Sequence, residues 1–342
     1  MKDSKEVTIY DIAKELDISA ATVSRGLNDH PAIKKETRRK IHDAARRMGY
    51  QQNIFASNLR KRKTNTIGVV IPHLNSYFTS TVIAGIEKVA NQAGYNLIIS
   101  QSLESVKKEK ANVNTMFNSR VDGLLVSLAS DTEDIDHFQF LLQKGIPLIF
   151  FDRVIENPEC TCIVINNFQA GYEATKHLLE QGCRRIVHVA GSLRSSVYEG
   201  RYSGYKQALT DFGLEFDPSL VLFPDLRDTE PGKIARTILA MNPLPDGIFT
   251  ANDTSAAACI SELRRTGVSV PDDVAVVGFN NDLLSRVIEP ALTTVHYPGQ
   301  EMGEVAARTL INKLNNLPND SLNTIVIQHE LLVRDSSKRQ KK

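Results

Sequence analysis

A change in the hydrophobic pattern near Thr66 constrains the fold of this chain more than any other feature. From there on, short apolar runs alternate with amphipathic stretches that often end at a glycine. The runs read IGVVIP, YNLIIS, VDGLLVSL, IPLIFF, CIVIN, RIVHVAG, DGIFTAND and VAVVGFNN. Strands this apolar are typical of parallel sheets that helices cover on both faces. The alternation therefore predicts an α/β fold of doubly wound parallel sheets.

The stretch that carries this pattern, residues 64–336, is long for a single hydrophobic core. Single cores stop growing at roughly 250–300 residues, so we expect the stretch to form two lobes. Ligands of doubly wound folds bind at the carboxyl ends of the strands. The cleft between two such lobes is therefore the predicted ligand site.

Polar and aromatic side chains that closely follow the apolar runs are the candidates for this cleft. They are His73, Asn75, Tyr77 and Phe78; Asp152 and Arg153; Arg201; Asn252 and Asp253; and Asn280, Asn281 and Asp282. Carboxylates and amides accept hydrogen bonds from hydroxyls, a guanidinium donates in a fixed fork, and aromatic faces pack against C–H groups. The set suits a small polyhydroxylated ligand. Structural alternatives remain open: Asp152 and Asp253 could cap helices, His73 could be a local hydrogen-bond partner, and Arg153 could bridge the lobes.

The chain before this stretch predicts three short helices. Thr8 is a good cap for the first, with Asp11 near its exposed N–H groups. Ser19 is a good cap for the second, AATVSRGLN, after a short break in the helical spacing. The third covers about residues 35–48 and ends at Gly49. Three short helices with a tight turn between the first two predict a helix-turn-helix.

The second helix of a helix-turn-helix lies in the major groove of DNA, and its N-terminal residues touch base edges. We expect Ala20, Ala21, Ser24, Arg25 and Asn28 to face outward there. Arg25 can pair with guanine through two hydrogen bonds, and an alanine methyl can pack against the thymine methyl. The alternative for the two alanines is helix propensity alone. The predicted DNA contacts in these helices are Thr8, Tyr10, Ser19, Ala20, Ala21, Thr22, Ser24, Arg25 and Asn28.

The charge distribution supports a polyanionic partner for this head. Residues 1–63 carry 15 Lys and Arg against 8 Asp and Glu, a net charge of +7. The rest of the chain carries 26 against 32, a net charge of −6. A basic head on an acidic body indicates that the head meets nucleic acid. The basic run at residues 60–63 is either a solubilising linker or a set of phosphate contacts.

VTIYDIAKELDISAATVSRGLND, followed by TRRKIHDAARRMGYQQNIFASNLR, resembles the LacI/GalR family of bacterial transcription regulators. The resemblance continues through the whole chain in the expected order. It implies a hinge helix that carries Asn53, Ala56 and Leu59. In the family this helix folds on operator DNA as a dimer and wedges its leucine pair into the minor groove. Lys34 departs from the pattern, since the family usually has a Ser or Thr cap there.

The resemblance also implies a domain plan. A helix-turn-helix domain covers residues 1–50, and a hinge helix and linker cover 51–63. A two-lobed body that resembles periplasmic binding proteins, with effector-binding and dimerisation roles, covers 64–336. Lobe 1 takes about 64–164 and 295–324, and lobe 2 takes about 165–294 and 325–336. Residues 337–342 are expected to be a disordered tail.

The resemblance narrows the candidates for the cleft. Arg201 matches the arginine that grips the effector, and Asp253 matches the aspartate of ANDTSA. Asn280 stands where many members carry a sugar-binding aspartate, so an effector more acidic than a plain hexose is one hypothesis, with Arg201 and Arg153 balancing its charge. The predicted effector-binding residues are His73, Tyr77, Phe78, Asp152, Arg201, Asn252, Asp253 and Asn280.

Catalytic, metal and membrane signals are absent from the sequence. It contains no GxGxxG, GxxxxGK[ST], GxSxG or HExxH motif, and its four cysteines form no CxxC pair. It has neither a signal peptide nor an apolar run of the ~18 residues that a membrane span needs. We therefore expect a cytoplasmic protein that is not an enzyme and that needs no cofactor or metal.

These observations predict a ligand-responsive transcription regulator, with repression of carbohydrate-use genes as the expected role. It is expected to bind a near-palindromic operator as a homodimer, with a sugar or sugar derivative in the cleft altering operator affinity. The alternatives are a constitutive DNA-binding regulator with a vestigial cleft and an enzyme with an accessory DNA-binding head. The sequence does not fix whether the effector releases DNA or promotes binding.

Overall fold

The computed structural model describes residues 7–50, 63–224, 226, 232–317 and 323–339. The chain divides into two compact units, Met1–Thr64 and Asn65–Lys342, and each is described by itself.

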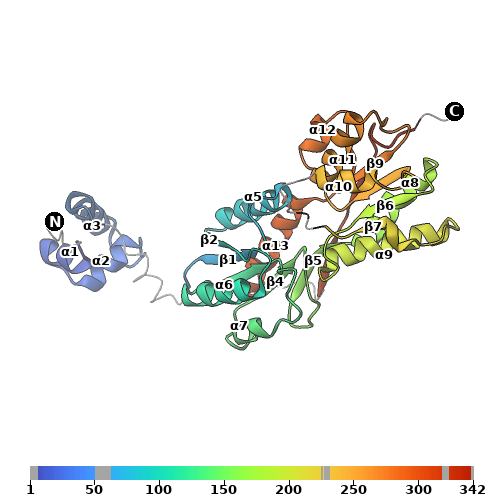
Figure 1. The fold of residues 1–342 in the computed structure, drawn as a ribbon. Coiled ribbons are helices and arrows are strands. Elements are labelled where there is room, and N and C mark those ends of the chain that lie inside the picture. The colour runs from blue at the N-terminus through green and yellow to red at the C-terminus, as the bar shows by residue number, and fades with distance from the viewer. Residues whose placement is uncertain (1–6, 51–62, 225, 227–231, 318–322, 340–342) are drawn as a thin grey trace, which may run out of the picture. The chain divides into compact units, whose positions relative to one another are not determined.

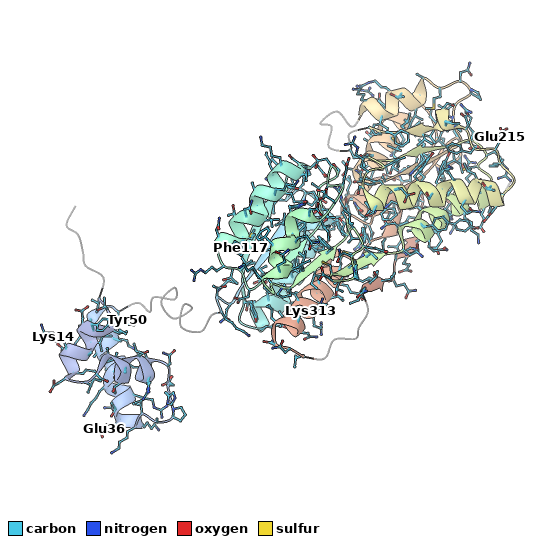
Figure 2. The ribbon with its side chains drawn as sticks, turned by 90° about the horizontal axis from the view of Figure 1, so that it is seen from below. Lys14, Glu36, Tyr50, Phe117, Glu215 and Lys313 are labelled. Carbon is cyan, nitrogen blue, oxygen red and sulfur yellow. The ribbon has the colours of Figure 1, made fainter. Side chains whose placement is uncertain are left out.

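The first unit, the head, consists of three helices around a small core. They are α1 (Ile9–Leu16), α2 (Ala20–Leu27) and α3 (Lys35–Met48). Ile12, Val23 and Ile41 supply one fully buried side chain from each helix. Charged side chains such as Lys14 and Glu36 lie on the outside (Figure 2). The expected three-helix head is present.

The first lobe of the second unit is built on a parallel sheet. Its strands are β1 (Thr66–Ile71), β2 (Asn96–Gln101), β3 (Gly123–Val126), β4 (Leu148–Phe151), β5 (Thr161–Ile165) and β11 (Thr324–Ile327), in the spatial order β11-β5-β4-β3-β1-β2. One face packs against α5 (Tyr77–Gln92) and α13 (Gly299–Leu314). The other packs against α6 (Val106–Asn118), the 3₁₀ turn Asp136–Phe138 and α7 (Gln139–Gln143).

The second lobe repeats this plan (Figure 1). Its strands are β6 (Ile186–Val189), β7 (Val221–Leu222), β8 (Gly247–Thr250), β9 (Ala275–Asn280), β10 (Thr293–His296) and β12 (Glu330–Leu332), in the order β12-β10-β9-β8-β6-β7. Helices α8 (Asn167–Glu180) and α9 (Ser196–Asp211) cover one face, and α10 (Gly232–Leu239) and α11 (Asp253–Arg265) cover the other. The 3₁₀ turn Pro218–Leu220 precedes β7, and α12 (Leu284–Val287) follows β9. The doubly wound α/β class is confirmed in both lobes.

The chain passes between the lobes three times, after β5, after β10 and after β11. β10 (Thr293–His296) belongs wholly to the second sheet and β11 (Thr324–Ile327) to the first, so two crossings lie a few residues later than the expected boundaries at 295 and 324. β12 pairs with β10 in the antiparallel sense, an edge-strand exception to the parallel sheets.

The C-terminal segment is ordered further than expected. Ser336 and Ser337 are fully buried, and the Ser337 hydroxyl lies 2.7 Å from Nε2 of His177. The Arg339 guanidinium donates to the carbonyl oxygens of Asp246 and Pro271. The expectation of a disordered tail is therefore wrong for residues 337–339, because backbone acceptors of the second lobe hold them, and residues 340–342 lie outside the described part.

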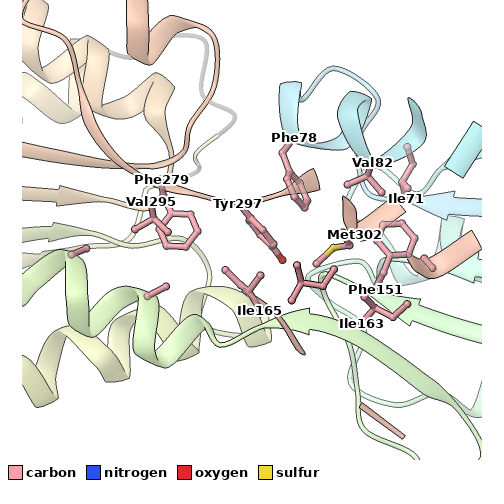
Figure 3. Close-up of a cluster of buried hydrophobic side chains, with 14 of the residues drawn as sticks. Ile71, Phe78, Val82, Phe151, Ile163, Ile165, Phe279, Val295, Tyr297 and Met302 are labelled. Atoms are coloured by element: carbon pink, nitrogen blue, oxygen red, sulfur yellow. The ribbon is translucent and has the colours of Figure 1, made fainter. Parts of the chain in front are cut away.

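The two lobes meet at a shared apolar cluster (Figure 3). The Tyr297 ring stacks on Phe78 at a centroid distance of 4.2 Å and meets Phe279 edge-on at 6.0 Å. Phe78 comes from α5 in the first lobe and Phe279 from β9 in the second. This cluster forms the floor on which the polar cleft is built.

Candidate functional site

Thr8 and Asp11 close the N-terminus of α1. The N–H and the hydroxyl of Thr8 both donate to one Asp11 carboxylate oxygen, at 2.8 and 2.7 Å. The Asp11 N–H donates in turn to the Thr8 carbonyl at 3.1 Å. These bonds confirm Thr8 as the cap of α1. The neighbouring residue Tyr10 is 71% exposed.

Ser19 caps the second helix as predicted. The Thr22 N–H donates to Oγ of Ser19 at 3.1 Å, and the two hydroxyls lie 2.9 Å apart. Ser19 and Thr22 thus stabilise the turn at the N-terminus of α2, which is the end that a major-groove helix presents to the bases. At α3, Lys34 stands at the cap position without a side-chain capping bond, as its departure from the family pattern predicts.

The outward face of α2 is narrower than the sequence suggested. Ala21 and Arg25 are exposed four positions apart, on one face of the helix. Ala20, expected to face outward, packs against the head core instead, because helical spacing aligns it with Val23 and Leu27. The Asn28 amide donates to the Ser24 carbonyl at 2.7 Å. The hinge residues Asn53, Ala56 and Leu59 lie outside the described residues.

A cleft of about 590 Å³ opens between the lobes of the second unit. Of the predicted effector residues, the first lobe contributes His73, Tyr77, Phe78 and Asp152, and the second contributes Arg201, Asn252 and Asn280. Most of them lie near strand ends or helix N-termini, as the doubly wound topology predicts, and Arg201 lies in the second turn of α9. The structure thus brings together side chains that are more than 200 positions apart in the sequence.

Arg201 is the buried cation of the cleft. Its guanidinium donates to Oδ1 of Asn167 at 2.9 Å and to the Ala251 carbonyl at 3.0 Å, and it lies 3.4 Å from the centroid of the Phe279 ring. Burial lowers the pKa of Arg201 from its ordinary value. Within the described residues, no carboxylate lies at ion-pair distance from Arg201, so neutral acceptors and an aromatic face hold this charge in place.

Asp152 is positioned by its backbone and by two hydroxyls. It adopts a left-handed φ of 60° directly after β4. The Tyr297 hydroxyl donates to Oδ1 at 2.8 Å and the Ser127 hydroxyl to Oδ2 at 3.2 Å. A carboxylate oxygen has further acceptor capacity beyond one such bond, so Asp152 can also accept from a ligand hydroxyl.

Arg153 is paired within the first lobe. It donates to both carboxylate oxygens of Glu104, at 2.8 and 2.7 Å, and both side chains are mostly buried. Burial opposes both charges, yet the pKa of Arg153 is raised by Tyr198 and Glu104, and the pKa of Glu104 is lowered by Arg153. The charge of Arg153 is therefore already balanced within the first lobe, and its contact with the described part of the second lobe is with an aromatic ring, since its guanidinium carbon lies 5.6 Å from the centre of the Tyr198 ring.

Asp253, predicted to bind the effector, does not line the cleft. It is fully buried at the start of α11, where the Thr294 hydroxyl donates to Oδ1 at 2.6 Å and the Asp282 N–H donates to Oδ2 at 2.7 Å. Burial raises the pKa of Asp253 to about 7. Asp253 fixes the loop after β9, and it is this loop that presents Asn280 and Asp282 to the cleft.

The loop after β9 has a backbone that suits asparagine. Asn280 and Asn281 have φ values of 111° and 58°, in the region that asparagine tolerates better than most residues. Asparagine in place of aspartate at position 280 therefore suits the backbone conformation there, and it also replaces a charged carboxylate by a neutral amide. Asp282 lines the cleft two residues later, and burial raises its pKa to about 6.

Sequence reasoning missed several residues of the cleft, chiefly Glu104, Tyr198 and Tyr297. Glu104 follows the run YNLIIS, so the strand-end rule could have found it. Tyr198 lies in the first turn of α9, three positions before Arg201, and Tyr297 directly follows β10. β10 is rich in threonine, and it was not among the apolar runs.

Metal and membrane features are not found in the described ranges. No three His, Cys, Asp or Glu side chains there are grouped so that they could hold a metal ion. None of the helices described is long and apolar enough to cross a membrane.

Comparison with known proteins agrees with this geometry. The family model for bacterial regulatory proteins of the lacI family matches residues 8–53, and that for periplasmic binding protein-like domains matches 175–337. The chain is 32% identical to catabolite control protein A of Priestia megaterium over 97% of its own length and 99% of the relative. It is 30% identical to a ribose operon repressor of Halalkalibacterium halodurans, covering 97% of each chain.

Among solved structures, a complex of the transcriptional regulator CelR with cellobiose is 28% identical, with a TM-score of 0.72 over 97% of this chain and 100% of that one. A helix-turn-helix head joined to a two-lobed binding-protein body defines a DNA-binding transcription regulator. The chain belongs to the LacI family of such bacterial regulators.

Proposed function

We propose that this regulator is a homodimeric, cytoplasmic repressor of carbohydrate-use genes, without catalytic activity, whose operator affinity is altered by a sugar-like effector in the interlobe cleft. The observation that carries the proposal is the convergence of Arg201, Asp152 and Asn280 from two lobes on one cleft above an aromatic floor. Relatives named for ribose and a neighbour solved with cellobiose support a carbohydrate.

The charge of the cleft favours a neutral polyhydroxylated effector over an acidic one. Arg153 is neutralised by Glu104, so it is not available to balance a ligand carboxylate or phosphate. Asp152 and Asp282 add negative charge beside Arg201, which among the described residues of the cleft is the one arginine or lysine without a carboxylate partner. Hydroxyls suit this mixture, because each can both donate to a carboxylate and accept from a guanidinium.

In the same proposal the head contacts DNA through α2 and the N-terminus of α1. The proposed contacts are Thr8 and Tyr10 at the start of α1, and Ser19, Ala21, Thr22, Ser24, Arg25 and Asn28 on α2 and its two caps. Two heads of a dimer match the two-fold symmetry of a near-palindromic operator. Asn53, Ala56 and Leu59 are proposed to form the minor-groove wedge.

The test is a thermal-shift screen of the full-length protein against neutral sugars, uronates and sugar phosphates, followed by operator binding with each hit. A neutral sugar at about 100 times its Kd should stabilise the protein by about 2.7 kcal/mol, and it should change operator affinity. A preference for uronates or phosphates would refute the neutral effector. Stabilisation by no compound would favour a constitutive regulator with a vestigial cleft.

A further inference from the structure

A second chamber of about 570 Å³ adjoins the cleft. Four of the described residues line both spaces, namely Glu104, Arg153, Tyr198 and Leu226. Each chamber alone falls within the range of about 300–1,000 Å³ that is typical of small-molecule sites. The two together offer more room than one sugar ring needs.

The Tyr198 side chain lines both chambers, and its ring is held in place by several contacts. The guanidinium carbons of Arg153 and Arg201 each lie 5.6 Å from the centre of the Tyr198 ring, so this ring contacts two cations. The ring also packs so tightly on Gly191 that any side chain at position 191 would collide with it. These contacts fix the Tyr198 ring where it can face ligands in both chambers.

Glu104, which also lines both chambers, is held at a conformational cost. Leu103 and Glu104 have φ values of 52° and 59°, a left-handed conformation that is unfavourable for a residue with a side chain. The bond from the Ser130 N–H at 2.9 Å and the pair with Arg153 keep the carboxylate in place. Strain of this kind is concentrated at ligand-binding sites.

The outer chamber differs in chemistry from the inner one. Leu193 and Phe223 line it with large apolar side chains that are 36% and 55% exposed. Phe223 packs edge-on against Tyr202, with ring centres 6.2 Å apart. Its polar lining includes Ser130 and Ser192. Exposed apolar side chains in a concave site, beside a few polar groups, indicate ligand contact.

We propose that the effector is a two-unit glycoside: the hydroxyl-rich ring lies in the inner chamber, and the unit on its glycosidic oxygen lies in the outer chamber against Phe223 and Leu193. This inference rests on the proposed function, since it names the chemical class of that same effector. The continuity of the two chambers through Tyr198 and Glu104 argues for one ligand that spans both. A sugar or aryl unit suits Phe223, because both present an apolar face.

The experiment is calorimetric titration of the full-length protein with matched probes that share one ring. Methyl glycosides of glucose, galactose, mannose and xylose supply the inner ring alone. The disaccharides and phenyl glycosides of the same sugars add a second unit, and they separate a sugar from an aryl group. Two-unit probes should bind roughly tenfold tighter than the methyl glycoside, as one aromatic stacking surface allows.

Phe223→Ala should remove this advantage and leave methyl glycoside binding unchanged. Phe212→Ala is the matched control, because Phe212 is similarly exposed but follows the far end of α9. Equal affinity for one-unit and two-unit probes, unchanged by Phe223→Ala, would overturn the second chamber and leave the effector cleft intact. Binding of no probe would overturn both. An effect of Phe223→Ala on operator affinity without ligand would assign the chamber to movements of the lobes, against the proposal.

Discussion

Ala21 can offer DNA only a methyl group, and it is exposed one turn before Arg25. On an operator selected in vitro, uracil in place of the contacted thymine should weaken wild-type binding by up to about 0.8 kcal/mol, about fourfold. Ala21→Gly should abolish this sensitivity. The comparison of thymine and uracil within each protein cancels the helix-propensity cost of glycine. Fluorescence anisotropy measures both affinities.

Ala20→Gly is the matched control for this prediction, because Ala20 packs against the head core. This variant should keep the preference for thymine and lose stability instead. A thymine preference that survives in Ala21→Gly would remove Ala21 from the reading of bases.

Asp282 predicts a pH dependence of stability. Its pKa rises from 3.8 to about 6 through burial, so the folded protein holds a proton that the unfolded chain has lost between these values. The contribution of Asp282 to the free energy of unfolding should therefore fall by at most about 3 kcal/mol as pH rises from about 4 to about 6, and Asp253, whose pKa is raised to about 7, should extend the fall to about pH 7. Asp282→Asn should remove the Asp282 part of this fall and make the curve less steep between pH 4 and pH 6. Urea denaturation from pH 4 to pH 8 measures it, and parallel curves for both proteins would contradict the assignment.

At the scale of elements, the close contact of α8 with α9 positions Arg201. A side chain at Gly204 would collide with the carbonyl of Phe168, and one at Gly171 with the backbone of Arg201 itself. Gly204→Ala should therefore push α9 outward and lower stability by about 1–3 kcal/mol. It should also weaken effector binding, because the Arg201 guanidinium moves with its helix.

Gln207→Ala on the exposed side of α9 is the control, and its stability should change by less than about 0.5 kcal/mol. Thermal denaturation and effector titration of both variants check this prediction. Wild-type effector affinity in Gly204→Ala, with reduced stability, would show that Arg201 does not depend on this helix contact.

Element by element, the apolar runs predicted the central strands well. All eight runs contain a strand of the described structure, because burial on both faces demands continuous apolar sequence. β7 has two residues, too few for a period, and β10 reads TTVH, with threonines that are buried against Asp253 and the C-terminal segment. Their partners come from distant parts of the chain, so no local pattern marks them.

The cleft was predictable to the extent that strand ends define it. His73 and Asp152 follow β1 and β4, Asn280 is the last residue of β9, and all three line the cleft. Asp253 also follows a strand, but its carboxylate turns inward to Thr294. The direction of a side chain after a strand depends on partners from other segments, and the sequence near position 253 does not contain them.

At the scale of the whole molecule, the head binds operator DNA and the cleft binds the proposed effector, and a regulator must couple the two sites. Coupling free energies are reciprocal: if the effector changes operator affinity by some factor, operator DNA changes effector affinity by the same factor. Values of about 5–150-fold are typical of such coupling. Calorimetric titration with the tightest-binding glycoside, with and without saturating operator, should therefore reproduce the factor obtained from operator binding with and without that glycoside. Arg25→Ala, which impairs the proposed base contact but leaves the cleft intact, should keep the affinity for free glycoside. Equal glycoside affinity with and without operator would show that the cleft does not control the head.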